Sequence, residues 1–146
     1  MLTQKKTVLF LCTKNSARSQ IAEALLRHLA NDAFEAYSAG LNPTDVHPMA
    51  IQVLREVGIQ TDGLYSKPVS TFLGKIRVNF AIVLCEDFEK LCPRIYPFAI
   101  DVLSWPLDDP IVAKKTDLEL LQAFRKVRDE LESRLIRWLA NEKKQT

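Results

Sequence analysis

The sequence predicts an α/β fold, a three-layer domain in which helices cover both faces of a four-stranded parallel sheet. Two short and continuously apolar runs, residues 8–11 and 80–84, have the length of strands that are buried on both faces. Segments with apolar residues at helical spacing alternate with the strand-like segments. This alternation indicates right-handed crossover connections, which place the strands parallel to one another.

The first part of the chain predicts a strand, a helix and a second strand. Residues 7–11 form the first strand, and residues 34–38 form the second, which we expect to stop at Ala39-Gly40. Between them, residues 20–30 form a helix with a single apolar stripe. The stripe consists of Ile21, Ala22, Leu25, Leu26 and Leu29.

A second helix is predicted over residues 48–57. Its first residue is a proline, which a first helical turn tolerates, and Gly58 suits the position just after a helix end. His47 then lies at or near the N-cap, where it serves as a cap or turn residue. Residues 69–76 predict a short helix, which Gly74 weakens.

The second half of the chain predicts two more strands and a long helix. Residues 80–84 form the third strand, and residues 100–103 form a weaker fourth strand whose apolar run is broken by an aspartate. Prolines divide the polar segment 86–97, which we expect to be a loop or a short mobile helix. Residues 116–119 have the spacing of a capping box and open the C-terminal helix. Its apolar stripe is Leu120, Phe124, Val127, Leu131, Leu135 and Leu139, with Trp138 as a further packing residue.

The composition indicates an ordinary soluble protein. A chain of 146 residues with 47% apolar and 26% charged residues suits one domain spanning residues 1–146. The net charge is only +2 and the basic residues are scattered, so we expect no nucleic-acid partner. No apolar signal segment is present, and no run approaches the roughly 20 residues of a membrane span. We therefore expect a cytoplasmic monomer without membrane association.

The segment Cys12-Thr13-Lys14-Asn15-Ser16-Ala17-Arg18-Ser19 lies between the first strand and the first helix. A helix N-terminus presents unpaired N–H groups and the positive end of the helix dipole, so an oxyanion can bind within this loop. Cys12 would lie at the floor, where the same amides and the Arg18 guanidinium favour the thiolate over the thiol. Lys14 adds charge at the rim, either to steer anions or as an ordinary solvated lysine.

Two further cysteines extend this chemistry. Cys85 ends the third predicted strand at the same sheet edge as Cys12, whereas Cys92 lies in the charged, proline-flanked segment. A metal site is disfavoured because there is no Cys-x2-Cys pair and no adjacent histidine. Packing would explain Cys85 but explains Cys92 less easily. The alternative is a relay, in which a second thiol attacks the adduct on Cys12 and expels a reduced product. Arsenate can be reduced in this way, whereas phosphate cannot.

These features resemble the low-molecular-weight protein tyrosine phosphatases and, more specifically, their relatives the thioredoxin-coupled arsenate reductases. The resemblance runs from Thr7 to the C-terminal helix. Gln20 stands where the phosphatases usually carry proline, and Ile111 stands where they carry an aromatic residue, so both departures favour the reductases. Besides the Cys12 to Ser19 segment, the resemblance rests on Arg18 to Glu23, Ser38-Ala39-Gly40, Val46-His47-Pro48 to Val57-Gly58-Ile59, Leu84-Cys85 with Cys92-Pro93, and Asp108-Asp109-Pro110.

The resemblance implies a role for each matching residue. Cys12 would be the nucleophile, Arg18 the oxyanion clamp and Ser19 a hydroxyl donor to the thiolate. Cys85 and Cys92 would pass the disulfide outward to thioredoxin, although the residues alone do not separate thioredoxin from a glutaredoxin-type donor. Asp109 would protonate the departing oxygen, although a turn carboxylate explains it equally well. The rest of the oxyanion-binding loop is Thr13, Lys14, Asn15, Ser16 and Ala17, in which Asn15 would fix the loop conformation.

Some of the reductases that this chain resembles bind potassium near the loop. Asn15, Glu23 and Ser38 match three ligand positions of that site, whereas Lys67 stands where those proteins carry an aspartate. We therefore expect that the Lys67 ammonium replaces the ion or that no ion binds. No tightly bound cofactor and no metal are expected.

The sequence thus predicts an enzyme that reduces arsenate to arsenite and serves arsenic detoxification. One alternative is a low-molecular-weight tyrosine phosphatase that hydrolyses aryl phosphate esters. We expect a side activity of this kind in any case, because the loop also suits phosphate. The other alternative is a non-enzymatic oxyanion binder or redox sensor, for which an acid such as Asp109 would be unnecessary.

Overall fold

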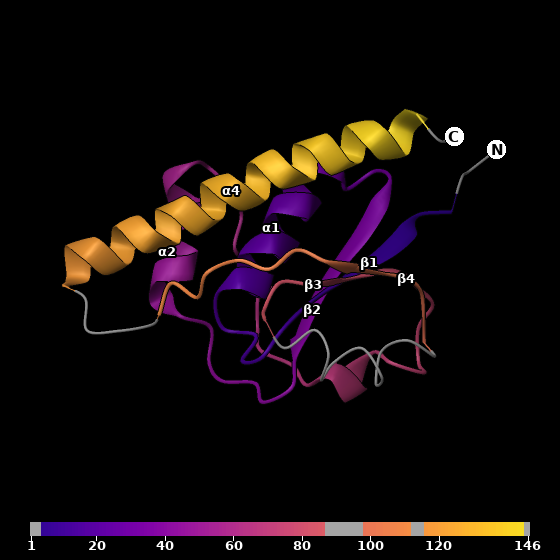
Figure 1. The fold of residues 1–146 in the computed structure, drawn as a ribbon, viewed down its shortest axis with the longest axis horizontal. Helices are drawn as coiled ribbons and strands as arrows, with labels where there is room; N and C mark the ends of the chain where they lie inside the picture. The colour runs from indigo at the N-terminus through magenta and orange to yellow at the C-terminus, as the bar shows by residue number, and fades with distance from the viewer. Residues whose placement is uncertain (1–3, 87–97, 112–115, 145–146) are drawn as a thin grey trace.

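The computed structural model describes residues 4–86, 98–111 and 116–144. At its centre lies a sheet of four parallel strands in the order β2-β1-β3-β4 (Figure 1). Leu11 lies opposite Val83, and Cys12 lies opposite Gly40, so the carboxyl ends of three strands meet at one edge. The strands are β1 (Lys6–Cys12), β2 (Phe34–Gly40), β3 (Val78–Val83) and β4 (Ala99–Ser104).

The strand order follows from how apolar each strand is. Val8, Leu9, Phe10 and Leu11 of β1 are fully buried because both faces of this strand are covered. β4 lies at the edge of the sheet, where Ile100 is 60% exposed. The prediction of a weaker fourth strand is therefore confirmed.

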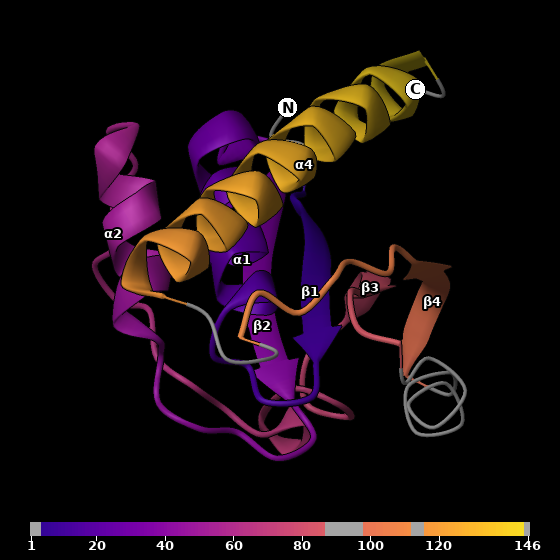
Figure 2. The ribbon, with the colours of Figure 1, turned by 60° about the vertical axis from the view of Figure 1, so that its left-hand side comes forward.

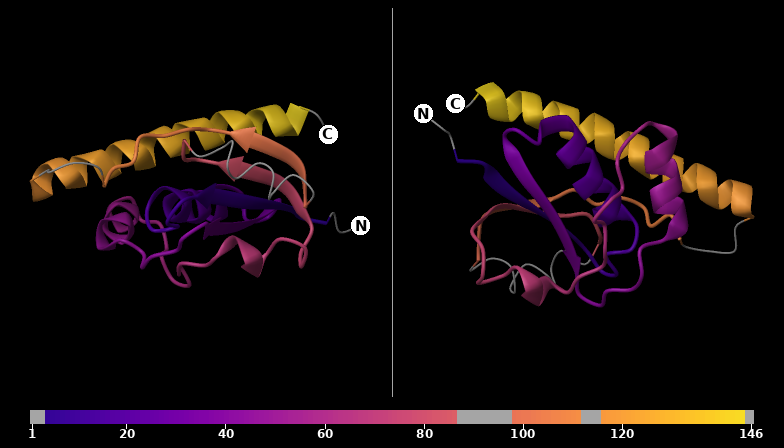
Figure 3. Two further views of the ribbon diagram at one scale, coloured as in Figure 1. Left: turned by 60° about the horizontal axis from the view of Figure 1, so that its bottom comes forward. Right: turned by 180° about the vertical axis from the view of Figure 1, so that it is seen from behind.

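Helices lie on both faces of the sheet. The helices α1 (Arg18–Ala30), α2 (Pro48–Glu56) and α4 (Asp117–Lys144) share one core with Val8 and Phe10 of β1. The long α4 runs across α1 and α2 (Figure 2). The opposite face carries the short 3-10 helix η1 (Val69–Thr71), as Figure 3 shows. These observations confirm the predicted α/β fold, with η1 as the helix that covers the second face in the described ranges.

Two predicted elements have different lengths in the structure. β2 continues through Gly40 instead of stopping before it, because the backbone of Gly40 pairs with β1 and its N–H donates to the carbonyl of Lys67 at 2.9 Å. The helix predicted over residues 69–76 was wrong in extent, since only the three residues of η1 are helical. Gly74 has a φ of +78°, which is incompatible with continuing a right-handed helix.

The predicted helix caps are confirmed. His47 is the N-cap of α2, and its Nδ1 accepts a hydrogen bond from the N–H of Met49 at 3.1 Å. Burial lowers the pKa of this imidazole, which favours the neutral form that the cap requires. At the start of α4, Thr116 and Glu119 bond reciprocally to each other's backbone N–H. Although α4 has 28 residues, no helix in the described ranges is long and apolar enough to cross a membrane.

Trp138 of α4 is a packing residue, as its position on the apolar stripe predicts. Its ring lies 5.2 Å from that of Phe34, 5.1 Å from that of Phe80 and 5.9 Å from that of Trp105, measured between ring centroids. These contacts join α4 to β2, β3 and the segment after β4.

Gly40 brings the end of β2 against the segment that follows β1. A Cβ atom at this position would lie 2.8 Å from the carbonyl oxygen of Thr13 and 2.9 Å from the backbone nitrogen of Asn15. Such approaches are too close for any side chain, so residue 40 has to be glycine for the loop to keep its shape.

The capping box makes a measurable contribution to stability. Replacing Thr116 with alanine should lower the free energy of unfolding by about 1 kcal/mol, because the backbone N–H of Glu119 loses the Thr116 hydroxyl as an acceptor. Urea unfolding followed by circular dichroism measures this. Glu119→Gln keeps an acceptor oxygen and should have a smaller effect, and equal losses in the two variants would contradict a reciprocal box.

Gly40→Ala should damage the loop rather than the sheet. The added methyl group has to displace Thr13 or Asn15, and we expect phosphate affinity to fall by about tenfold, which corresponds to a loss of about 1.4 kcal/mol of binding free energy. Calorimetric titration with inorganic phosphate measures the loss. Gly63→Ala is the matched control, because Gly63 has a φ of +82° but no atom near its absent Cβ. It should cost about 1 kcal/mol of stability while leaving phosphate affinity unchanged.

Candidate active site

Cys12 lies at the carboxyl end of β1, at the start of the loop of residues 13–17 that leads into α1. We call residues 12–18 the Cys12 loop. The thiol is almost fully buried at the base of a cavity of about 180 Å³. Loop residues line most of the cavity, and two residues from the segment after β4 complete it. The lining residues are Cys12, Thr13, Lys14, Ser16, Ala17, Arg18, Asp109 and Ile111.

The backbone of the Cys12 loop is held from outside. The carbonyl groups of Thr13, Lys14 and Ser16 accept hydrogen bonds from the segment between β2 and α2, at 2.8–2.9 Å. These oxygens are therefore directed away from the centre of the loop. Ala17, the N-cap of α1, has no side-chain acceptor to occupy the first-turn amides. The positive end of α1 is thus open to an anion in the cavity.

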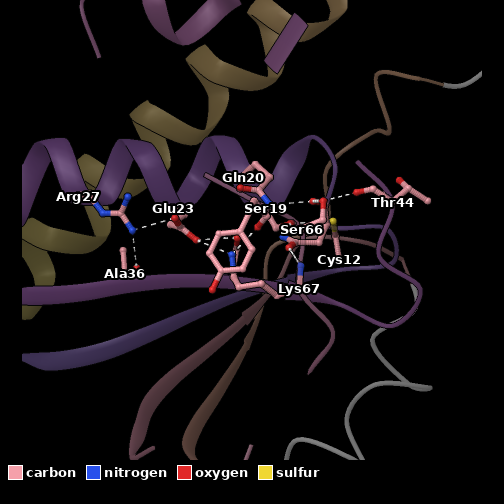
Figure 4. Close-up of polar contacts among 12 residues, drawn as sticks. Cys12, Ser19, Gln20, Glu23, Arg27, Ala36, Thr44, Ser66 and Lys67 are labelled. Atoms are coloured by element: carbon pink, nitrogen blue, oxygen red, sulfur yellow. Dashed lines mark hydrogen bonds and ion pairs between the residues drawn. The ribbon is translucent and has the colours of Figure 1, made fainter. Parts of the chain in front are cut away.

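Asn15 determines the conformation of the loop. Its φ of 51° lies in the left-handed region, which asparagine tolerates better than most residues. The side-chain oxygen accepts the backbone N–H of Lys67 at 2.9 Å, and the side-chain nitrogen donates to the hydroxyl of Ser19 at 2.7 Å. Figure 4 labels Ser19 and Lys67, the two partners of Asn15, near Cys12. The role predicted for Asn15, fixing the loop, is consistent with this geometry.

Ser19 joins Asn15 to the cysteine. Its Oγ lies 3.0 Å from the Sγ of Cys12, and both atoms are buried. Because Ser19 already accepts a hydrogen bond from Asn15, its own proton is available to point at the sulfur. The arrangement therefore suits a thiolate at Cys12.

Arg18 spans the cavity. One terminal nitrogen of its guanidinium donates to the carbonyl of Leu107 at 2.9 Å and approaches that of Leu84 at 3.5 Å. The other lies 3.8 Å from the Oδ2 of Asp109. Arg18 is 9% exposed. The hydrogen bond to Leu107 fixes one edge of its guanidinium group, and the remaining N–H groups can donate to an oxyanion.

Asp109 has a turn contact and also lines the cavity. Its Oδ1 accepts the N–H of Ile111 at 2.9 Å, as a turn carboxylate does. Its Oδ2 faces Arg18, and the residue lines the cavity above Cys12. The turn thus holds the carboxyl group where it can reach a bound oxyanion.

Cys85 lies close to the same edge of the sheet. The N–H of Leu84 donates to the carbonyl of Leu11 at 2.8 Å, so the chain after β3 continues alongside β1. Cys12 and Cys85 are both buried free thiols and belong to one cluster of packed residues on the same face of the sheet. Cys92, the predicted third member of the relay, lies outside the described residues.

The potassium-site positions are held together by a lysine. The Glu23 carboxylate accepts the hydroxyl of Ser38 at 2.8 Å and lies 3.7 Å from the Nζ of Lys67. Burial lowers the pKa of Lys67, and the Glu23 charge opposes this shift. A monovalent cation beside Glu23 would meet the ammonium charge at short range, so the absence of a bound ion stays a prediction. In the described ranges, no three His, Cys, Asp or Glu side chains are grouped to hold a metal.

The sequence did not predict the side chains of Gln20 and Ser66 as supports of the Cys12 loop. Gln20 donates to the carbonyls of Asn15 and Tyr65, both at 2.9 Å. The Ser66 hydroxyl has one proton to donate and lies within hydrogen-bond distance of the carbonyls of Asn15, at 2.8 Å, and Thr44. The sequence singled out Gln20 only as a departure from the proline of the phosphatases, and nothing in it indicated these hydrogen bonds. The contribution of residues 65–67 had no local signal, because they reach the loop across about 50 positions of chain.

Known proteins are similar to this chain in sequence and in fold. The chain is 37% identical over 131 residues to an arsenate reductase of Shouchella clausii, covering 90% of this chain and 93% of the relative. A solved arsenate reductase in the phosphate-binding state superposes with a TM-score of 0.79 at 33% identity, covering 93% of this chain and 98% of that one. A thioredoxin-dependent arsenate reductase of Corynebacterium glutamicum matches with a TM-score of 0.73 at 25% identity, covering the whole of this chain and 66% of that one.

The family assignment rests on the length of the match as well as on the loop. The sequence model of the low molecular weight phosphotyrosine protein phosphatases matches residues 7–146, which include the Cys12 loop, Cys85 and Asp109. The chain therefore belongs to the low molecular weight phosphotyrosine protein phosphatase family.

Proposed function

We propose that this protein is an arsenate reductase that uses three cysteines and is regenerated by thioredoxin. The observation that carries the proposal is the presence of two buried thiols, Cys12 and Cys85, in one packed cluster beside an oxyanion-sized cavity. A phosphatase needs only the first of them. Relatives named arsenate reductase over about nine-tenths of the chain support the same conclusion.

The first step joins arsenic to the enzyme. The Cys12 thiolate attacks the arsenic of a bound arsenate, whose oxygens are held by the N-terminal amides of α1 and by Arg18. One oxygen leaves as water, after Asp109 supplies a proton to it, because free oxide is a poor leaving group. Arg18 and Asp109 both line the cavity in which we propose that the anion binds, which supports these two roles.

The second step reduces the arsenic. The Cys85 thiolate attacks the sulfur of Cys12, so that an S–S bond forms and the S–As bond breaks. The electron pair of the broken bond stays on arsenic, which leaves as arsenite. Cys92 then attacks Cys85 and releases the Cys12 thiolate. The remaining Cys85–Cys92 disulfide is reduced by a dithiol protein, and the thioredoxin-dependent neighbour supports thioredoxin in that role.

The cavity argues against aryl phosphates as the main substrates. Among the described residues, none that lines it is aromatic. An aryl ester would therefore lack a ring to stack on, whereas a small inorganic oxyanion needs none. Slow hydrolysis of such esters remains expected, because the loop would also bind their phosphate group.

The relay predicts different losses for the three cysteines. Cys12→Ser should abolish both arsenate reduction and aryl phosphate hydrolysis. Cys85→Ser and Cys92→Ser should each abolish multiple-turnover reduction yet leave hydrolysis within about twofold of wild type. An assay coupled to thioredoxin, thioredoxin reductase and NADPH measures reduction, and p-nitrophenyl phosphate measures hydrolysis. Loss of both activities in the Cys85 or Cys92 variant, or of neither, would count against the relay.

Asp109→Asn tests the general acid. The amide keeps the bond to the N–H of Ile111 but cannot deliver a proton, so turnover should fall by about 100-fold or more. Steady-state kinetics of arsenate reduction at several pH values measure this. The neighbouring Asp108→Asn is the matched control and should retain normal turnover. Similar rates in the two variants would assign Asp109 to the turn alone.

A further inference from the structure

Tyr65 has an unusual environment for an exposed aromatic residue. Its side chain is 60% exposed, yet the centroid of its ring lies 4.1 Å from the Nζ of Lys67. The carbonyl oxygen of Tyr65 also accepts a hydrogen bond from this Nζ at 2.6 Å. One residue therefore contacts the same ammonium group through both its ring and its backbone.

The ammonium that Tyr65 covers is buried. Lys67 is only 4% exposed, and Glu23, 3.7 Å away on the other side, is 2% exposed. Burial disfavours the charged form of Lys67, so each contact that compensates for lost water matters. An aromatic ring whose π face covers the ammonium is one of the few neutral groups that can compensate for this lost water.

The backbone of Lys67 connects this group to the nucleophile. Its N–H donates to Asn15, which donates to Ser19, which contacts Cys12. Its carbonyl accepts the N–H of Gly40. If the ammonium left Glu23 for water, the backbone at residue 67 would lose a constraint on which the Asn15 side chain depends.

We propose that Tyr65 is a positioning residue, which retains the Lys67 ammonium beside Glu23 as an internal cation and so makes the Cys12 loop independent of external monovalent cations. The cation beside Glu23 then belongs to the chain itself. Without the ring, the lysine can swing into solvent and leave the oxygens of Glu23, Ser38 and Tyr65 to an external ion.

Thermal unfolding tests the proposal without arsenate. Wild type and Tyr65→Phe should unfold at the same temperature in potassium chloride as in choline chloride of equal ionic strength. Tyr65→Leu and Lys67→Met should be stabilised by potassium specifically, by on the order of 5 °C, because an ion that binds only the folded state raises its stability. Phe98→Leu, a change at another exposed aromatic ring, is the matched control and should show no potassium effect.

The reactivity of Cys12 provides a second measurement. In a Cys85→Ser/Cys92→Ser background, alkylation of Cys12 by iodoacetamide at neutral pH should be about tenfold slower with Tyr65→Leu. Potassium, but not choline, should restore the rate, and Tyr65→Phe should match the background protein. The proposal is overturned if potassium changes neither the unfolding temperature nor the Cys12 alkylation rate of Tyr65→Leu. It is also overturned if potassium changes either quantity in the wild-type protein. Neither measurement involves arsenate turnover, so failure of the reductase proposal would leave this result intact.

Discussion

The environment of the nucleophile depends on one chain of hydrogen bonds that begins at the backbone of Lys67. That N–H orients the Asn15 amide, the amide donates to Ser19, and the Ser19 proton is left for Cys12. Residue 15 has to adopt a left-handed backbone conformation to place its side-chain amide between Lys67 and Ser19, and asparagine tolerates this conformation. Because the donors are neutral and buried, the direction of each bond is set by the preceding one.

The parallel sheet explains why distant segments converge on this site. Each crossover returns the chain to the same edge, so the ends of β1, β2 and β3 lie together, and the segment after β4 returns to the same cavity. Arg18 connects these segments by bonding the carbonyl of Leu107 while facing Asp109. Ligands bind at this edge in open α/β sheets generally. A second thiol at the same edge would allow the same scaffold to carry electrons instead of transferring phosphate.

Three groups of the chain surround the carboxylate of Glu23. Ser38, Arg27 and Lys67 each approach its oxygens, at 2.8, 2.9 and 3.7 Å. A buried charge of this kind is costly when one partner is removed. An internal ammonium has a practical advantage over a bound ion, because its occupancy does not depend on ion concentration. This cluster also connects β2, α1 and the segment before η1, which are the elements that support the Cys12 loop.

The sequence alone determined the order and type of the principal elements, the helix caps and the identity of the anion loop, because each depends on neighbours a few residues apart. Apolar runs defined β1 and β3, and Thr116 with Glu119 defined the start of α4. The tertiary structure decided that β2 extends to Gly40, that Gln20 and Ser66 clamp the carbonyl of Asn15, and that Tyr65 covers Lys67. These contacts join residues that meet only after the strands have paired, so no local pattern in the chain encodes them.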